Sequence, residues 1–145
     1  MTIRTALTSD FPILVGIWEA SVRATHDFLA EDDLQALRPR MLHEWLPAVE
    51  LAVFVDARGE TLGFMGTSGE SLEMLFIAPS ARGMGIGRAL VEHAIRELAV
   101  RVVDVNEQNG QAVGFYRRMG FEVVGRSELD GQGRPYPLLH MRLAG

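Results

Sequence analysis

The pattern of apolar and polar positions divides the chain into segments of two periods. Alternating or continuous apolar runs predict strands at 3–7, 51–55, 62–67, 71–78, 102–105, 122–129 and 138–143. Apolar residues repeated every three or four positions predict helices after residue 10, over 30–46, after residue 87 and over 111–119. This order, β-α-α-β-β-β-α-β-α-β-β, predicts an α/β fold with a mixed sheet and helices on both faces. We expect residues 1–145 to form a single domain.

The first helix has a clear start signal and one apolar stripe. Thr8, Ser9 or Asp10 is expected to cap it, with Pro12 in its first turn, where a missing N–H is tolerated. Positions i, i+3, i+4, i+7 and i+8 of its stripe are Leu14, Ile17, Trp18, Ser21 and Val22. We therefore expect Trp18 to pack in the core rather than to recognise a ligand.

Two further helices carry signals at their ends. The stretch 30–46 is expected to be interrupted by Pro39 and stopped by Pro47, because proline removes a backbone donor and clashes with the preceding turn. The side chain of Asn109 is expected to cap the helix 111–119, and the glycine that follows should end it.

Composition excludes several classes of protein. The 145 residues include no cysteine, which rules out a disulfide framework, a thiolate zinc site and a cysteine nucleophile. No stretch resembles a secretory leader or a membrane span, so we expect a cytoplasmic protein without a membrane partner. All basic side chains are arginine, so side-chain lysine self-acetylation is impossible.

The charge is unevenly distributed along the chain. The net charge is −5, and residues 1–69 hold five basic and ten acidic side chains, against nine of each in residues 70–145. An acidic first half favours a cationic amine as ligand and disfavours nucleic acid, which needs a basic face. A solvated acidic surface without a binding role is the alternative interpretation.

A glycine-rich turn lies between the predicted strand 71–78 and the helix that follows. Gly83, Gly85 and Gly87 stand where the chain enters that helix, and they carry no Cβ atoms that would block a phosphate. The unpaired N–H groups and the dipole of a helix N-terminus favour an anion. The spacing is neither the Walker pattern nor the dinucleotide fingerprint. The sequence therefore predicts a phosphate cradle, with an ordinary flexible turn as the alternative.

Two blocks resemble the GNAT superfamily, the GCN5-related N-acetyltransferases. Arg82-x-x-Gly85-x-Gly87, after a strand that ends in Ile77-Ala78-Pro79, is similar to motif A of the family. The pattern N-x-x-A-x-x-F-Y-x-x-x-G-F over residues 109–121 is similar to its second block. Residues 24–29 and 133–139 resemble a bacterial subgroup, the YjaB-type members. The resemblance implies the GNAT fold, with a twisted sheet of about six to seven strands.

The resemblance also implies acetyl-CoA, or CoA, as the bound cofactor. Main-chain groups of 82–88 would hold the pyrophosphate, and those around 75–77 would pair with the pantetheine arm of a splayed strand. Arg82 and Arg88 would assist by charge, although exposed arginines are more often solvated. The implied cofactor-binding residues are Leu75, Phe76, Ile77, Arg82, Gly83, Met84, Gly85, Ile86, Gly87, Arg88, Asn106, Asn109, Phe115 and Tyr116.

Acetyl transfer to an amine needs a proton donor for the leaving thiolate and a proton acceptor for the amine. Tyr116 is the candidate acid, with a packed core tyrosine as the alternative. Glu73 is the candidate base or acceptor-binding group, with a solvent-exposed carboxylate on the sheet as the alternative. His26 is the other candidate base, because imidazole titrates near neutral pH. The acceptor-binding residues are expected to be Thr25, His26, Asp27, Phe28 and Glu73.

The remaining histidines are weaker candidates for a catalytic role. His43, His93 and His140 fall in periodic segments, which favours structural or surface roles, and no histidine and carboxylate cluster has metal spacing. We therefore expect no metal site. Acceptor specificity is expected to reside in residues 18–50 and 126–137. We expect the protein to be a monomer or a homodimer.

The predicted function is transfer of an acetyl group from acetyl-CoA to a primary amine of a cationic small molecule or peptide, by direct attack and without a covalent intermediate. Three alternatives stand beside it: a non-catalytic acyl-CoA-binding or sensing module, an acetyltransferase for protein N-termini or aminoacyl-tRNA, and a different nucleotide-binding domain. The acidic balance argues against the RNA substrate.

Overall fold

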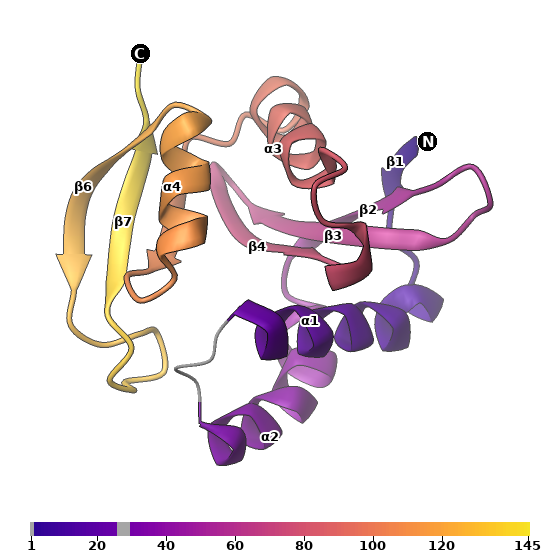
Figure 1. The fold of residues 1–145 in the computed structure, drawn as a ribbon, viewed down its shortest axis with the longest axis horizontal. Coiled ribbons are helices and arrows are strands. Elements are labelled where there is room, and N and C mark those ends of the chain that lie inside the picture. Colours follow the sequence, from indigo (N-terminus) through magenta and orange to yellow (C-terminus); the bar gives the residue numbers. More distant parts are fainter. Residues whose placement is uncertain (1, 26–29) are drawn as a thin grey trace.

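The computed structural model describes residues 2–25 and 30–145 of the chain, without the side chain of Thr25. One sheet of seven strands has the order β1-β2-β3-β4-β5-β7-β6. Its strands are β1 Thr2–Thr5, β2 Glu50–Val55, β3 Thr61–Ser68, β4 Ser71–Ile77, β5 Val102–Asn106, β6 Phe121–Ser127 and β7 Leu138–Leu143. The α-helices are α1 Phe11–Thr25, α2 Glu31–Arg40, α3 Ile86–Glu97 and α4 Gly110–Arg118. The predicted order of strands and helices and the mixed sheet are confirmed (Figure 1).

Helices cover both faces of this sheet. In Figure 1, α1 and α2 lie on one side of the β2–β4 strands, and α3 lies on the other. Two apolar cores follow from this arrangement, one for each face. The core on the α3 and α4 side includes Met65, Leu72, Leu90, Val103, Tyr116 and Met141, all buried. The core on the α1 and α2 side includes Leu14, Trp18, Leu34, Val53 and Phe64.

The stripe predicted for the first helix is buried along its whole length. Leu14 is fully buried, and the other four positions of the stripe have exposed fractions of at most 8%. Trp18 packs in the second core, as the sequence predicted. Within the described residues no helix is both long and apolar enough to cross a membrane.

The strands β4 and β5 diverge from each other. They are parallel, and their register contains only two pairs, Ser71 with Val102 and Leu72 with Val103. The rest of β4 pairs with β3 alone, so its other edge faces the gap that separates the two parts of the sheet in Figure 1. A strand edge without a partner presents free N–H and C=O groups to a ligand. This is the splay that the family resemblance implies.

A β-bulge lies on the other edge of β4. Gly66 of β3 pairs with Met74 and Thr67 pairs with Leu72, which leaves Glu73 as the extra residue. Strict alternation would place Glu73 and Met74 on opposite faces of the sheet. Both side chains instead line one hollow on the α1 and α2 side. The bulge therefore breaks the alternation at Glu73, which is exposed.

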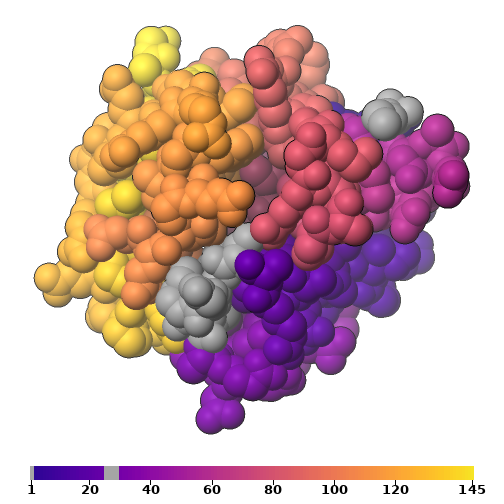
Figure 2. Space-filling view, viewed as in Figure 1, coloured from indigo at the N-terminus to yellow at the C-terminus, as the bar shows by residue number. Residues whose placement is uncertain are grey.

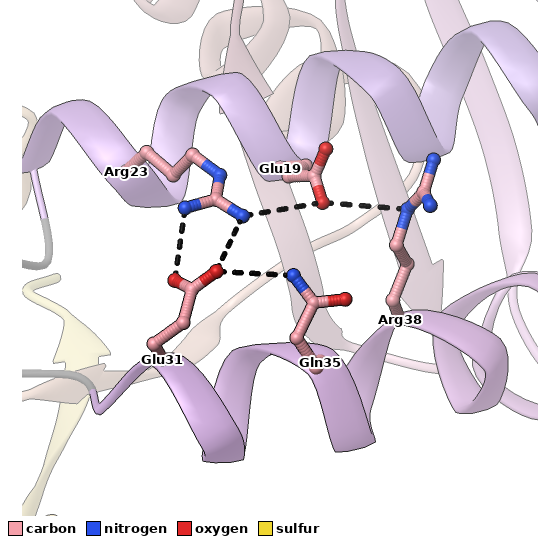
Figure 3. A network of polar contacts seen from close by, with 5 residues as sticks. All are labelled: Glu19, Arg23, Glu31, Gln35 and Arg38. Carbon is pink, nitrogen blue, oxygen red and sulfur yellow. Dashed lines mark hydrogen bonds and ion pairs between the residues drawn. The ribbon is translucent and has the colours of Figure 1, made fainter.

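A polar network joins α1 to α2 (Figure 3). Arg23 donates two hydrogen bonds to Glu31, at 2.9 and 3.0 Å, and lies 3.7 Å from Glu19. Gln35 donates to Glu31 at 3.1 Å, and Arg38 lies 3.4 Å from Glu19. Ion pairs this exposed contribute little to stability individually. Together they link Glu19 and Arg23 of α1 to Glu31, Gln35 and Arg38 of α2.

Two boundaries differ from the sequence prediction. Pro39 does not interrupt its helix, because α2 continues across it to Arg40, and a π-helical turn, Met41–Trp45, follows. The Leu46 N–H donates to the Met41 carbonyl at 3.0 Å, so the wider turn begins two residues after the proline. The first strand ends at Thr5 rather than at residue 7, because the Asp10 carboxylate accepts the Leu7 N–H at 2.7 Å and turns the chain into α1.

Candidate active site

A cavity of about 320 Å³ opens where β4 diverges from β5. Its walls are β4, the glycine loop, the start of α3 and one face of α4. Figure 2 shows a recess between the surface of α4 and the surface of the segment from the glycine loop into α3. We call it the cofactor cavity. Twelve of the predicted cofactor residues line it: Leu75, Phe76, Ile77, Arg82, Gly83, Gly85, Ile86, Gly87, Arg88, Asn109, Phe115 and Tyr116.

The glycine loop has the backbone that an anion cradle needs. Gly83 and Gly85 have φ angles of +80° and +79°, a region that favours glycine. A Cβ at either position would meet no atom within 4 Å, so it would project into open space beside the cavity. The first helical bond of α3 runs from the Ala89 N–H to the Gly85 carbonyl at 3.0 Å. The amides of residues 86–88 therefore have no partner inside the helix.

The third glycine has a packing role. A Cβ on Gly87 would lie 3.6 Å from the Phe115 ring and 3.8 Å from Ile77. This glycine lets α3 start close to both α4 and the end of β4. Two helices and a strand therefore meet at this point of the cavity wall.

Tyr116 lies between the first core and the cofactor cavity. Its ring packs edge-on against Phe115 and Phe121, with centroids 5.1 and 5.8 Å away, and its exposed fraction is 7%. Burial raises the pKa of the Tyr116 hydroxyl far above its ordinary value. The phenol therefore keeps its proton at neutral pH. Tyr116 packs in the core, as the alternative interpretation held, and it also lines the cavity; its role as a proton donor stays a prediction.

Three arginines line the cofactor cavity, and they differ in their pairing. Arg88 donates to Glu92 at 2.9 Å, one helical turn along α3. Neither Arg82 nor Arg118 forms an ion pair with another described residue. The sequence analysis missed Arg118, although Gln111, Phe115 and Arg118 follow at i, i+4 and i+7 on one face of α4. Gly114 leaves room for its guanidinium, since a Cβ there would lie 3.3 Å from Nη1.

Asn109 has the capping role that the sequence predicted. Its side chain accepts the Ala112 N–H at 3.1 Å at the start of α4, and the residue also lines the cavity. Two other predicted cofactor residues lie outside the cavity lining. Met84 is at the tip of the loop with an exposed fraction of 57%, and Asn106 ends β5, where its carbonyl accepts the Asn109 N–H.

A second hollow lies next to the cofactor cavity, on the α1 and α2 side of β4. We call it the Glu73 hollow. Its volume is about 440 Å³, and its walls include Trp18, Trp45, Met74 and Phe76. Phe76 also lines the cofactor cavity, so the two spaces meet at this residue. Glu73 is the acidic group in the lining, and it makes no hydrogen bond or ion pair to another described residue.

The loop between β6 and β7 reaches the mouth of the Glu73 hollow through Gln132. Arg40 donates to the Gln132 side chain at 2.6 Å, and its guanidinium lies 4.8 Å from the centre of the Trp45 ring. At the end of the loop, Tyr136 donates to Asp33 at 2.5 Å, and Arg134 forms an ion pair with the same carboxylate. Helix α2 therefore holds this loop in place. Residues from both predicted acceptor stretches, 18–50 and 126–137, line this hollow, and their acceptor role stays a prediction.

The other predicted acceptor residues cannot be placed. His26, Asp27 and Phe28 lie outside the described residues, and so does the side chain of Thr25. Among the residues that the structure describes, no three histidine, aspartate or glutamate side chains gather in a way that could hold a metal ion.

These features define a protein with a glycine loop and a cavity at the splayed edge of its sheet, beside an aromatic hollow with one carboxylate. Comparison with known families agrees, since the model of the acetyltransferase (GNAT) domain matches residues 19–144. The chain therefore belongs to the GNAT family and is an N-acetyltransferase.

Individual proteins of this family are similar to the chain over nearly its whole length. Peptidyl-lysine N-acetyltransferase YjaB of Escherichia coli K12 is 46% identical over 145 residues, which cover 100% of this chain and 98% of the relative. The enzyme of the same name from Salmonella typhimurium LT2 is 49% identical over 128 residues, 88% of each chain. The solution structure of apo YjaB from E. coli has a TM-score of 0.90 and 45% identity, and the match covers 99% of this chain and 97% of that one.

Proposed function

We propose that this enzyme transfers the acetyl group of acetyl-CoA to a primary amine, with the lysine side chain of a peptide or protein as the acceptor. One observation carries the proposal: the cofactor cavity and the Glu73 hollow are adjacent and share Phe76 of β4 in their linings. An amine that enters the hollow would thus reach a thioester held in the cavity. The peptidyl-lysine activity named for the YjaB proteins supports the choice of acceptor.

The residues of the cofactor cavity fit acetyl-CoA. Positive φ angles at Gly83 and Gly85, open space at their Cβ positions and the free amides of residues 86–88 suit a pyrophosphate. Arg82 and Arg118 would add positive charge, and the unpaired edge of β4 at 75–77 would pair with an extended amide-bearing arm. Acetyl-CoA supplies an activated acyl group, and the chain's task is to position it.

The Glu73 hollow fits an ammonium group on an apolar stem. Trp18, Trp45 and Phe76 offer aromatic surface to the methylene groups, and the Glu73 carboxylate offers a partner for the charge. The amine must be neutral to attack, so we assign Glu73 the role of accepting its proton, directly or through water. An apolar surrounding favours the neutral amine as well, because desolvation lowers the pKa of a cation.

Tyr116 would donate the proton that the departing sulfur needs. Burial raises the pKa of its hydroxyl, so it is protonated at the pH of the reaction. The remaining rate enhancement comes from holding the two reactants together. No covalent intermediate is required, which agrees with the absence of cysteine from the chain.

Two measurements test the proposal in order. Acetyl-CoA and CoA should raise the melting temperature while ATP and NAD do not, because only a ligand of the native state stabilises it. Peptides with one lysine and a blocked N-terminus should then be acetylated in preference to lysine-free peptides with a free N-terminus. The reverse preference would make the enzyme an N-terminal acetyltransferase. Binding of acetyl-CoA with no turnover of either peptide would favour a sensing module.

A further inference from the structure

Three polar side chains are linked by hydrogen bonds on the outer face of β5, β7 and β6. His140 on β7 lies 2.6 Å by its Nδ1 from an Asp104 oxygen on β5, and 2.7 Å by its Nε2 from the Ser127 Oγ on β6. Asp104 and His140 are direct cross-strand partners. Their neighbours Val103, Val105 and Met141 point the other way, into the first core. None of the three lines the cofactor cavity or the Glu73 hollow.

The positions of the protons on Asp104, His140 and Ser127 follow from the geometry of their hydrogen bonds. An ionised aspartate only accepts hydrogen bonds, so the Nδ1 of His140 must carry the proton that bonds to Asp104. In the neutral imidazole, Nε2 is then an acceptor, and the Ser127 hydroxyl donates to it. A serine hydroxyl that donates to a histidine, itself oriented by a carboxylate, is the arrangement that activates serine as a nucleophile.

A glycine makes room for the imidazole ring. Gly125 is the cross-strand partner of His140, and a bulge in β6 lies just before it. A Cβ on Gly125 would lie 3.4 Å from His140 Cδ2 and 3.7 Å from its Cβ. With only hydrogen there, the ring lies along β6 and reaches Ser127, two residues further on. The His140 side chain is 36% exposed and Asp104 58%, so a small reagent has access to the site.

We propose that Ser127 is a second reactive site of this enzyme, an acylation site for small activated carboxylic esters. The Ser127 Oγ attacks the carbonyl carbon, and its proton passes to His140 Nε2. The bond from the carbonyl carbon to the leaving oxygen breaks, and that oxygen takes the proton from Nε2. The products are acyl-Ser127 and an alcohol or phenol. Asp104 holds the imidazole in the tautomer that accepts the proton.

The test is acetylation of the intact protein by p-nitrophenyl acetate, followed by peptide mapping. The chain holds no lysine, so no side-chain amine competes, and the tryptic peptide 127–142 contains Ser127 as its single serine. The exposed Ser68 and Ser80 provide reference rates within the same sample. We expect Ser127 to be acetylated about 100-fold faster than either, the usual size of a general-base contribution.

A variant separates activation from simple exposure. His140→Gln keeps a hydrogen-bonding side chain but removes the base, and it should slow Ser127 acetylation about 100-fold while Ser68 and Ser80 react as before. Equal rates for Ser127 and the two reference serines in the wild-type protein would overturn the proposal without any variant. The three side chains would then only link their strands. Ser127→Ala should lose this label while Ser68 and Ser80 react as before.

Discussion

The cofactor cavity and the Glu73 hollow share Phe76 of β4 in their linings, and they are built in different ways. Backbone dominates the cofactor cavity: a glycine loop with positive φ, free helix amides and an unpaired strand edge. Side chains from separate elements dominate the hollow: Trp18 of α1, Trp45 of the π-helical turn, Glu73 of β4 and Gln132 of the β6–β7 loop.

The difference shows how one fold can keep its cofactor and change its acceptor. Backbone amides bind phosphate with little regard for the surrounding side chains. An acceptor is selected by the shape and charge of side chains, and each wall of the Glu73 hollow can be substituted alone. Substitutions on the cofactor side should therefore change binding of acetyl-CoA, and substitutions in the hollow should change only the use of the amine.

The largest expected effect comes from the glycine loop. Gly85→Val would place a branched side chain in the cradle and would lose at least two hydrogen bonds to charged groups, at about 1.5–3 kcal/mol each. We expect the Kd for acetyl-CoA, measured by calorimetry, to rise by about 100-fold or more. The control is Gly59→Val, which has a similar φ of +82° in a turn that does not line the cavity. Both variants should lose comparable stability, of order 1–3 kcal/mol, and only Gly85→Val should lose binding.

The next effect concerns the proton donor. Tyr116→Phe removes the hydroxyl and keeps the buried ring, so kcat should fall about 100-fold while the Kd for acetyl-CoA stays within twofold. Because burial raises the pKa of this hydroxyl, the wild-type enzyme should show no loss of rate from Tyr116 ionisation up to about pH 10. Steady-state kinetics of the wild type and the Phe variant, measured up to about pH 10, give both the change in kcat and the pH dependence of the rate. Unchanged kcat in the Phe variant would leave Tyr116 with a packing role alone.

A smaller effect is expected in the hollow. Glu73→Gln keeps the shape and removes the charge, so kcat/KM for a lysine peptide should fall about tenfold, with acetyl-CoA binding unchanged. Glu122→Gln, an exposed strand carboxylate on β6, is the matched control and should have wild-type kinetics. A loss of acetyl-CoA affinity in Glu73→Gln would contradict the separation of the two spaces.

The smallest effect is expected at the rim of the cofactor cavity. Arg118→Gln should raise the Kd for acetyl-CoA about fivefold at low salt, since one exposed charge contributes roughly 1 kcal/mol, and the difference should shrink as salt increases. The neighbouring Arg117 does not line the cavity, so Arg117→Gln should bind like the wild type. Equal effects from both arginines would indicate general charge attraction instead of a contact.

Most of the fold could be predicted because its signals are local. Periodicity gave the order of strands and helices, and the Asn109 cap and the buried face of α1 are as expected. Pro39 was misjudged: α2 continues across it to Arg40 and a π-helical turn follows, which a single sequence does not reveal. Arg118 was missed, although its helical spacing from Phe115 carried the necessary information.

By itself, the sequence determined most of the lining of the cofactor cavity. The glycines at 83, 85 and 87 and the block 109–121 are local motifs, and the groups proposed to bind phosphate belong to the same few residues that form the turn. Only the tertiary structure decided the acceptor side. Glu73 lies at a bulge in the pairing of β4 with β3. Gln132 accepts a hydrogen bond from Arg40, which is 92 residues away in sequence. Such contacts are made by folding, and the hydrophobic pattern of any one segment does not contain them.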